Sequence, residues 1–147
     1  MENYFLKNKI FISFLFGLLL ISFISCSKTE DKVPYVPVNI QINLSNPEYI
    51  NLNAIGNSIY VTGGYKGIIL YRQSIDEIIA MDRACPYDPD CSRVILDDTG
   101  IIATDTCCGS EYSVIMTGAV LKGPSEYPLR QYQCYFNQNT NELQITN

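Results

Sequence analysis

The chain has 147 residues, of which 47% are hydrophobic, and its formal net charge is −5. It contains no histidine, so a Ser–His–Asp triad and any histidine metal ligand are excluded. The basic residues form no cluster in the sequence, which argues against nucleic-acid binding.

The first 25 residues have the layout of a secretory signal. Lys7 and Lys9 precede an apolar run at residues 10–24. This run is shorter than the roughly 20 residues that a membrane-spanning helix needs. Ser25 then precedes Cys26, and this junction resembles a bacterial lipobox. The resemblance implies cleavage before Cys26 and attachment of acyl chains such as palmitate to that cysteine; an ordinary signal peptide and a single-pass anchor are the alternatives.

Residues 26–37 are polar, charged and proline-bearing, which predicts a flexible tether between the lipid and the folded domain. Within them, Glu30 and Asp31 resemble the acidic surface-export signals of some Gram-negative lipoproteins of the Bacteroidetes kind; a merely solvated linker is the alternative. The resemblance implies a protein of the bacterial cell envelope, anchored in the outer membrane. Whether it faces the periplasm or the cell surface stays open.

Residues 38–147 predict a single β domain. Residues 38–44 alternate apolar and polar side chains, which is typical of a half-buried strand. Residues 67–72 are nearly all apolar, so we expect a strand buried on both faces. A turn is expected at residues 97–100, and a helical turn or loop at residues 47–53. The predicted class is therefore all-β, a small antiparallel sandwich or barrel. Further strands are expected at residues 58–62, 77–82, 93–96, 101–103, 112–116, 119–122, 131–136 and 142–146.

Two cysteine-bearing loops stand out in this domain. Residues 84–87 are Ala-Cys-Pro-Tyr, residues 107–112 are Cys-Cys-Gly-Ser-Glu-Tyr, and residues 123–125 are Gly-Pro-Ser. This pattern resembles the Rieske iron–sulfur family, whose loops have the sequences Cys-x-His and Cys-Pro-Cys-His-Gly-Ser, with a Gly-Pro loop over the cluster. The resemblance covers roughly residues 39–147. It implies a Rieske-like antiparallel β-sandwich or barrel with a loop subdomain.

The resemblance assigns the four ligand positions of the family to Cys85, Tyr87, Asp105 and Cys108. In the family, two cysteines hold one iron and two histidines hold the other. Here Tyr87 and Cys108 occupy the histidine positions, and Asp105 occupies a cysteine position. Tyrosine replaces imidazole poorly, and a carboxylate is too hard a ligand for a soft cluster. We therefore expect no cofactor, with a [2Fe-2S] cluster on atypical ligands as the alternative.

The resemblance also implies a disulfide that joins the two loops, Cys91–Cys107. An exported protein meets an oxidising compartment, where such a bond is stable. Cys85–Cys108 is the preferred second pair. The sequence alone leaves the connectivity of the cysteines after Cys26 open.

The remaining cysteine and the metal alternative have separate expectations. Cys134 alternates with Tyr132 and Phe136 on one strand face, so we expect a buried free thiol. A zinc ion or an all-cysteine cluster on the four loop cysteines is an alternative, although their spacing is atypical of zinc sites.

Three functions follow from these patterns. The first is a non-catalytic structural or binding module of the envelope, held to the membrane through Cys26 and facing an unknown protein partner. The second is an electron-transfer protein with an atypical cluster or metal on the loop cysteines. The third is a thiol-redox protein that uses Cys107 and Cys108. No catalytic residue is expected for the first, and a fold alone does not decide among them.

Overall fold

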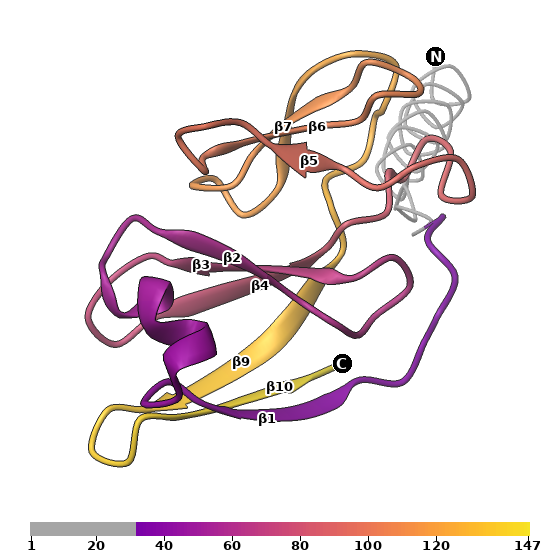
Figure 1. Ribbon diagram of the computed structural model, residues 1–147. Helices are drawn as coiled ribbons and strands as arrows, with labels where there is room; N and C mark the ends of the chain where they lie inside the picture. Colours follow the sequence, from indigo (N-terminus) through magenta and orange to yellow (C-terminus); the bar gives the residue numbers. More distant parts are fainter. Residues whose placement is uncertain (1–31) are drawn as a thin grey trace, which may run out of the picture. The chain divides into compact units, whose positions relative to one another are not determined.

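The computed structural model describes residues 32–147, which form a β domain (Figure 1). The predicted signal peptide, residues 1–25, and the predicted lipidation site Cys26 lie outside the described residues. No helix in the described part of the chain is long and apolar enough to cross a membrane.

The described residues form ten strands and one short 3-10 helix, which confirms the all-β class. Every strand overlaps a predicted one, and the helix lies where a helical turn was expected. The bounds are β1 Asn39–Asn43, η2 Pro47–Asn53, β2 Ser58–Val61, β3 Ile68–Arg72, β4 Ile78–Asp82, β5 Ile95–Leu96, β6 Ile102–Thr104, β7 Glu111–Ser113, β8 Ala119–Lys122, β9 Gln131–Asn137 and β10 Glu142–Thr146.

The strands form two antiparallel sheets. Six strands make a curled sheet in the order β1-β10-β9-β4-β3-β2, and four make a smaller sheet in the order β5-β6-β7-β8 (Figure 1). The smaller sheet lies in the connection between β4 and β9, which themselves pair at Ala80–Tyr132 and Met81–Gln131. The β5–β8 unit is therefore inserted in the sequence between two strands that pair directly with each other.

The central strands β3 and β4 are buried on both faces, which was predicted for β3 from its apolar sequence. Alternate side chains of a strand point to opposite faces of the sheet. Ile68 and Leu70 pack into the core inside the curled sheet. Ile69 and Met81 pack into a second core, toward the β5–β8 unit. β3 and β4 thus form the middle layer of a three-layer domain.

β7 is shorter than the strand predicted at residues 112–116, because the chain turns after Ser113. The Ser113 hydroxyl accepts a hydrogen bond from the Met116 N–H at 3.2 Å, and the Gly118 N–H donates to the Ser113 carbonyl at 2.8 Å. Thr117 adopts a φ of 55° within this turn. A local hydrogen bond to the serine hydroxyl competes with the strand ladder, so β7 ends here.

Residues 33–37, which precede β1 and lie within the expected tether, contact the β domain. Val33 is only 2% exposed and is therefore part of the folded unit. The Arg130 guanidinium donates to the carbonyls of Val33 and Pro34, the latter at 2.7 Å. Asn147 donates to the Val36 carbonyl at 2.7 Å. The polar, proline-bearing composition predicted a linker, but these non-local contacts hold residues 33–37 against the domain.

Asp82, at the end of β4, organises the turn that follows β2. Its buried carboxylate accepts hydrogen bonds from the backbone N–H groups of Tyr65 (2.6 Å), Lys66 (3.2 Å) and Ala84 (2.8 Å), and from the Tyr132 hydroxyl (2.6 Å). These four donors offset the cost of burying the carboxylate. The turn is thereby fixed to the core.

The buried hydroxyl of Tyr132 is expected to make the domain less stable at alkaline pH. Burial raises the pKa of Tyr132 far above its usual value, and the Asp82 carboxylate raises it further. Because the folded-state pKa exceeds the unfolded one, this contribution is complete below about pH 10 and is lost as the pH rises. We expect the free energy of unfolding, measured in urea at a series of pH values, to fall above about pH 10 by about 1.4 kcal/mol per pH unit for this group alone.

The substitution Tyr132→Phe isolates this contribution. It removes the hydrogen bond to a buried carboxylate, so stability at pH 7 should fall by roughly 1–3 kcal/mol. Above pH 10 the decline of the variant should be shallower than that of the unaltered protein by about 1.4 kcal/mol per pH unit. Equal alkaline slopes for the two proteins would contradict the assignment.

Candidate functional site

The cysteine loops lie at one end of the β5–β8 unit. The first loop, residues 83–94, connects β4 to β5 and is closed by a bridge between Ala84 and Arg93. The second, residues 105–110, connects β6 to β7, and the third, residues 123–130, connects β8 to β9. Antiparallel strands place alternate connections at the same end of a sheet, which brings the three loops together.

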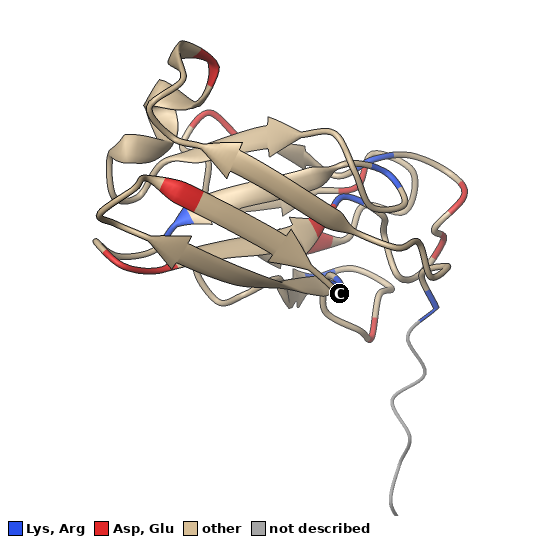
Figure 2. Cartoon of the chain, turned by 90° about the horizontal axis from the view of Figure 1, so that it is seen from below, with Lys and Arg blue, Asp and Glu red and all other residues tan. Residues whose placement is uncertain are grey.

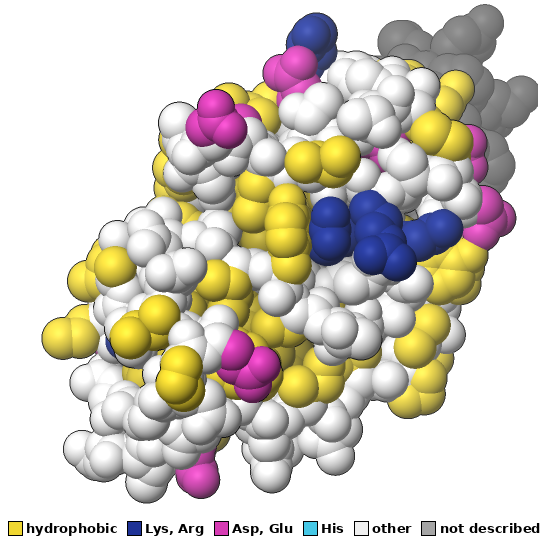
Figure 3. Space-filling model, viewed as in Figure 1, with side chains coloured by type: hydrophobic (Ala, Val, Ile, Leu, Met, Phe, Trp, Pro, Cys, Tyr) yellow, Lys and Arg dark blue, Asp and Glu magenta, His cyan; other side chains and the backbone are white. Residues whose placement is uncertain are grey.

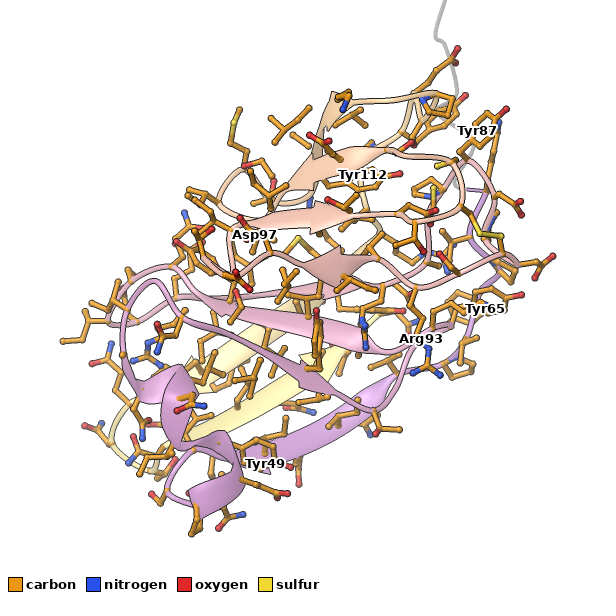
Figure 4. The ribbon with its side chains drawn as sticks, turned by 45° about the horizontal axis from the view of Figure 1, so that its top comes forward. Tyr49, Tyr65, Tyr87, Arg93, Asp97 and Tyr112 are labelled. Atoms are coloured by element: carbon orange, nitrogen blue, oxygen red, sulfur yellow. A yellow bond between two sulfur atoms is a disulfide. The ribbon has the colours of Figure 1, made fainter. Side chains whose placement is uncertain are left out.

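The disulfide predicted between the first two loops is present. Cys91 is bonded to Cys107, and their Cα atoms are 6.4 Å apart (the disulfide is a yellow bond in Figure 4). Cys107 is therefore not a free thiol. The thiol-redox hypothesis cannot use Cys107 and Cys108 as a reduced pair in this state of the protein.

The cysteines of the second predicted pair, Cys85 and Cys108, lie close together but are not bonded. Cys85 and Cys108 are free thiols whose sulfur atoms are 3.4 Å apart. Cys85 is fully buried, whereas Cys108 is partly exposed. The structure thus brings the two side chains together, but the disulfide Cys85–Cys108 is not formed in it.

Asp105 closes the second loop. Its Oδ1 atom accepts hydrogen bonds from the backbone N–H groups of Cys107 at 2.7 Å and Cys108 at 3.0 Å, and the Gly109 N–H donates to the Asp105 carbonyl at 2.9 Å. An aspartate in such a turn stabilises it by bonding to the backbone just ahead. The side chain is fully buried, so its carboxylate also faces the interior of the loop end.

Hydroxyl groups connect the sulfur atoms to the rest of the unit. The Tyr112 hydroxyl lies 3.1 Å from Cys85 Sγ, and the Ser110 hydroxyl lies 3.0 Å from Cys108 Sγ. The Ser125 N–H in the third loop donates to the Ser110 hydroxyl at 3.1 Å. All three loops therefore share one hydrogen-bonded network around the two thiols.

Sequence reasoning missed the role of these hydroxyls. Tyr112 is fully buried, with its hydroxyl against Cys85. The absence of histidine excluded a catalytic triad, and no other role was expected for Ser110. The motif Cys-Gly-Ser-Glu-Tyr contained both residues, but nothing in it indicated which sulfur each hydroxyl would meet.

Three of the four ligand positions that the resemblance assigned converge. The donor atoms of Cys85, Asp105 and Cys108 all lie within 4.8 Å of one another. Tyr87 is at the same end of the unit, but its side chain is 52% exposed (Figure 4). With two thiols, one carboxylate already bonded to backbone N–H groups, and no histidine in the chain, this donor set does not fit a cluster that needs two imidazole ligands.

The thiol of Cys85 is held in its neutral form. Burial is the main cause that raises its pKa, and the neighbouring Cys108 raises it further, against the opposing effect of the Tyr112 hydroxyl. A neutral thiol is a weak nucleophile, and metal binding must first remove its proton. Cys85 is therefore poorly suited to covalent catalysis.

Cys134 is a free thiol on β9, as expected, and it is half-buried rather than fully buried. It packs against the core inside the curled sheet. Burial raises its pKa to about 12, so it is protonated at neutral pH. It behaves as a small apolar side chain and takes no part in the loop end.

No protein-family model matches the sequence. No curated protein matches it either.

Proposed function

We propose that this protein is a lipid-anchored envelope protein whose Rieske-like domain lacks the histidine-ligated cluster and acts as a non-catalytic binding module. The observation that carries the proposal is the meeting of Cys85, Asp105 and Cys108 within 4.8 Å, at the end that Cys91–Cys107 closes. The resemblance assigned these positions to one site from sequence alone. Their convergence supports the Rieske-like origin of the loops, and their chemistry argues against the cluster.

The loop end is suited to binding because it is rigid. A disulfide, an aspartate-capped turn and the Ser110–Ser125 hydrogen bond fix its three loops. A preorganised surface loses less conformational entropy when it binds. We therefore place the partner surface at this end of the β5–β8 unit.

The test is the iron and acid-labile sulfide content of the full-length chain, purified in mild detergent without oxygen or chelator. We expect a colourless, folded protein with far less than one iron per chain. Near-stoichiometric iron and sulfide with a visible absorption band would contradict the proposal. A thiol count on the same sample should find Cys85, Cys108 and Cys134 reactive after unfolding without reductant.

A single thiophilic ion at Cys85, Asp105 and Cys108 is the second candidate function. Two thiolates bound to one zinc ion at about 2.3 Å would have their sulfurs roughly 3.8 Å apart. The observed 3.4 Å therefore needs only a small opening. The test is the zinc content of the same preparation. Stoichiometric zinc that is lost in Cys85→Ser but kept in Cys134→Ser would support this candidate, and a zinc-free protein that binds none on titration would eliminate it.

A further inference from the structure

Three cationic side chains gather in one pocket of this acidic protein. Lys66, Arg83 and Arg93 line a pocket of about 370 Å³ beside the turn that follows β2. Basic side chains form a compact dark blue patch on this face in Figure 3. The acidic residues, in contrast, are spread over several loops and strand ends (Figure 2). The sequence showed no basic cluster because these three residues are far apart along the chain.

In the described part of the chain, none of the three cations forms a salt bridge. Within residues 32–147, no carboxylate lies within 4.0 Å of the charged nitrogens of Lys66, Arg83 or Arg93. Two acidic residues that contact the turn at residues 65–66 are engaged by other groups. Asp82 is buried with four hydrogen-bond donors, and Asp90 accepts the hydroxyl of Tyr65.

Arg83 is fixed in position by protein contacts. Its guanidinium carbon lies 3.7 Å from the centroid of the Tyr60 ring, and its Nε atom donates to the Val94 carbonyl at 3.1 Å. The Tyr60 hydroxyl in turn accepts from the Leu96 N–H at 2.7 Å. Neither Nη atom of Arg83 has a hydrogen-bond partner in the described part of the chain. The side chain is therefore preorganised, and its Nη groups can donate hydrogen bonds to a ligand.

Lys66 lines the same pocket from the turn that follows β2. Its backbone N–H is bonded to Asp82, and its ammonium group donates to the Asp90 carbonyl at 3.1 Å. Gly67 follows with a φ of 100°, and a Cβ atom there would lie 3.4 Å from Cδ of Arg83. An L side chain would be strained at this φ, so glycine suits the conformation of the turn.

Arg93 completes the set from the first cysteine loop. Its side chain is exposed and lies near Tyr65, which lines the same pocket (Figure 4). It shares the pocket with Arg83 and Lys66, so three like charges lie together there. Like charges held close together repel one another, and an anion bound between them reduces that repulsion.

We propose that this pocket binds a tetrahedral oxyanion, a phosphate or sulfate group, between Arg83 and Arg93 with Lys66 as the third cation. Planar guanidinium groups bind such oxyanions through two parallel hydrogen bonds, and lysine adds a mobile point charge. The excess of acidic residues on the chain disfavours long polyanions, so a single group fits best. The pocket is separate from the Cys85–Cys108 pair, and the inference stands whether or not those thiols bind metal.

Isothermal titration of the full-length protein in a neutral, phosphate-free detergent at low ionic strength tests the proposal. We expect inorganic phosphate or sulfate to bind saturably at one site per chain. Arg93→Gln and Arg83→Gln should each weaken binding at least tenfold. Lys122→Gln is the matched control, because Lys122 is an exposed cation on β8 that pairs with Glu111 at 3.0 Å, and it should bind like the unaltered protein.

Arg93 is the decisive position because its exposed side chain can be changed without disturbing the core. Absence of saturable binding by both anions, or wild-type affinity in Arg93→Gln, would overturn the proposal. A parallel titration with glycerol phosphate distinguishes the source of the anion. Tighter binding than inorganic phosphate indicates a phosphate ester such as a lipid headgroup, and weaker binding indicates the free anion.

Discussion

Gly123→Ala is expected to lower the free energy of unfolding by roughly 3–5 kcal/mol, from backbone strain and steric overlap together. Gly123 has a φ of 105°, which L side chains rarely adopt. A Cβ atom there would lie 2.5 Å from Cα of Ser110 and 2.9 Å from its backbone nitrogen. Because these are backbone atoms, no side-chain rotation can relieve the overlap, and the third loop must separate from the second. Urea unfolding at pH 7 measures the effect.

Gly109→Ala is the matched control. Gly109 also has a positive φ, 74°, but a Cβ atom there meets nothing within 4 Å. Its substitution should cost only the conformational strain, about 1–2 kcal/mol. The difference between the two variants therefore measures the close approach of the third loop to Ser110. Equal losses of unfolding free energy in the two variants would contradict the close approach of Gly123 to Ser110.

Removal of the disulfide by the paired substitutions Cys91→Ala and Cys107→Ala is expected to lower stability by about 3 kcal/mol. The bond closes a loop with a sequence separation of 16 residues, and its loss frees the unfolded chain. It also frees the two loops that hold Cys85 and Cys108, so Cys108 should react faster with a thiol reagent in the native state. Urea unfolding with and without dithiothreitol, followed by mass spectrometry of labelled thiols, measures both effects.

Reductant provides the internal control for this variant. Dithiothreitol should destabilise the unaltered protein by a similar amount and leave the double variant unchanged. Cys134→Ala should keep the full response to reductant, because Cys134 is a free thiol outside the loop end. A wild-type protein whose unfolding is insensitive to reductant would be inconsistent with a stabilising bond between the first two loops.

The strands were predictable because local sequence marks both their faces and their ends. β3 and β4 are apolar on both faces, and the turn at residues 97–100 separates β5 from β6. Where the prediction failed, a non-local or side-chain contact decided the structure. The hydroxyl of Ser113 ends β7 early, and the Arg130 guanidinium holds residues that composition assigned to a tether.

The cysteine site was predictable in position but not in detail. The Rieske resemblance assigned Cys85, Asp105 and Cys108 to one site, and the structure brings their donor atoms within 4.8 Å. The partners of the thiols were not predictable, because the hydroxyls of Tyr112 and Ser110 reach them only after the sheet has formed. The cationic pocket had no sequence signal, since Lys66 comes from the turn after β2 and the two arginines from opposite ends of the loop at residues 83–94.

The place of the β5–β8 unit in the chain has a consequence for how such a domain can change over evolutionary time. Since β4 and β9 pair directly, the unit could in principle be replaced by a short turn without interrupting the larger sheet. Yet its removal would expose the outer side chains of the middle layer, among them Ile69 and Met81, which are fully buried. Exposing such a continuous apolar surface is unfavourable and promotes aggregation. Selection for folding alone is therefore sufficient to retain the unit, whatever chemistry its cysteine loops perform.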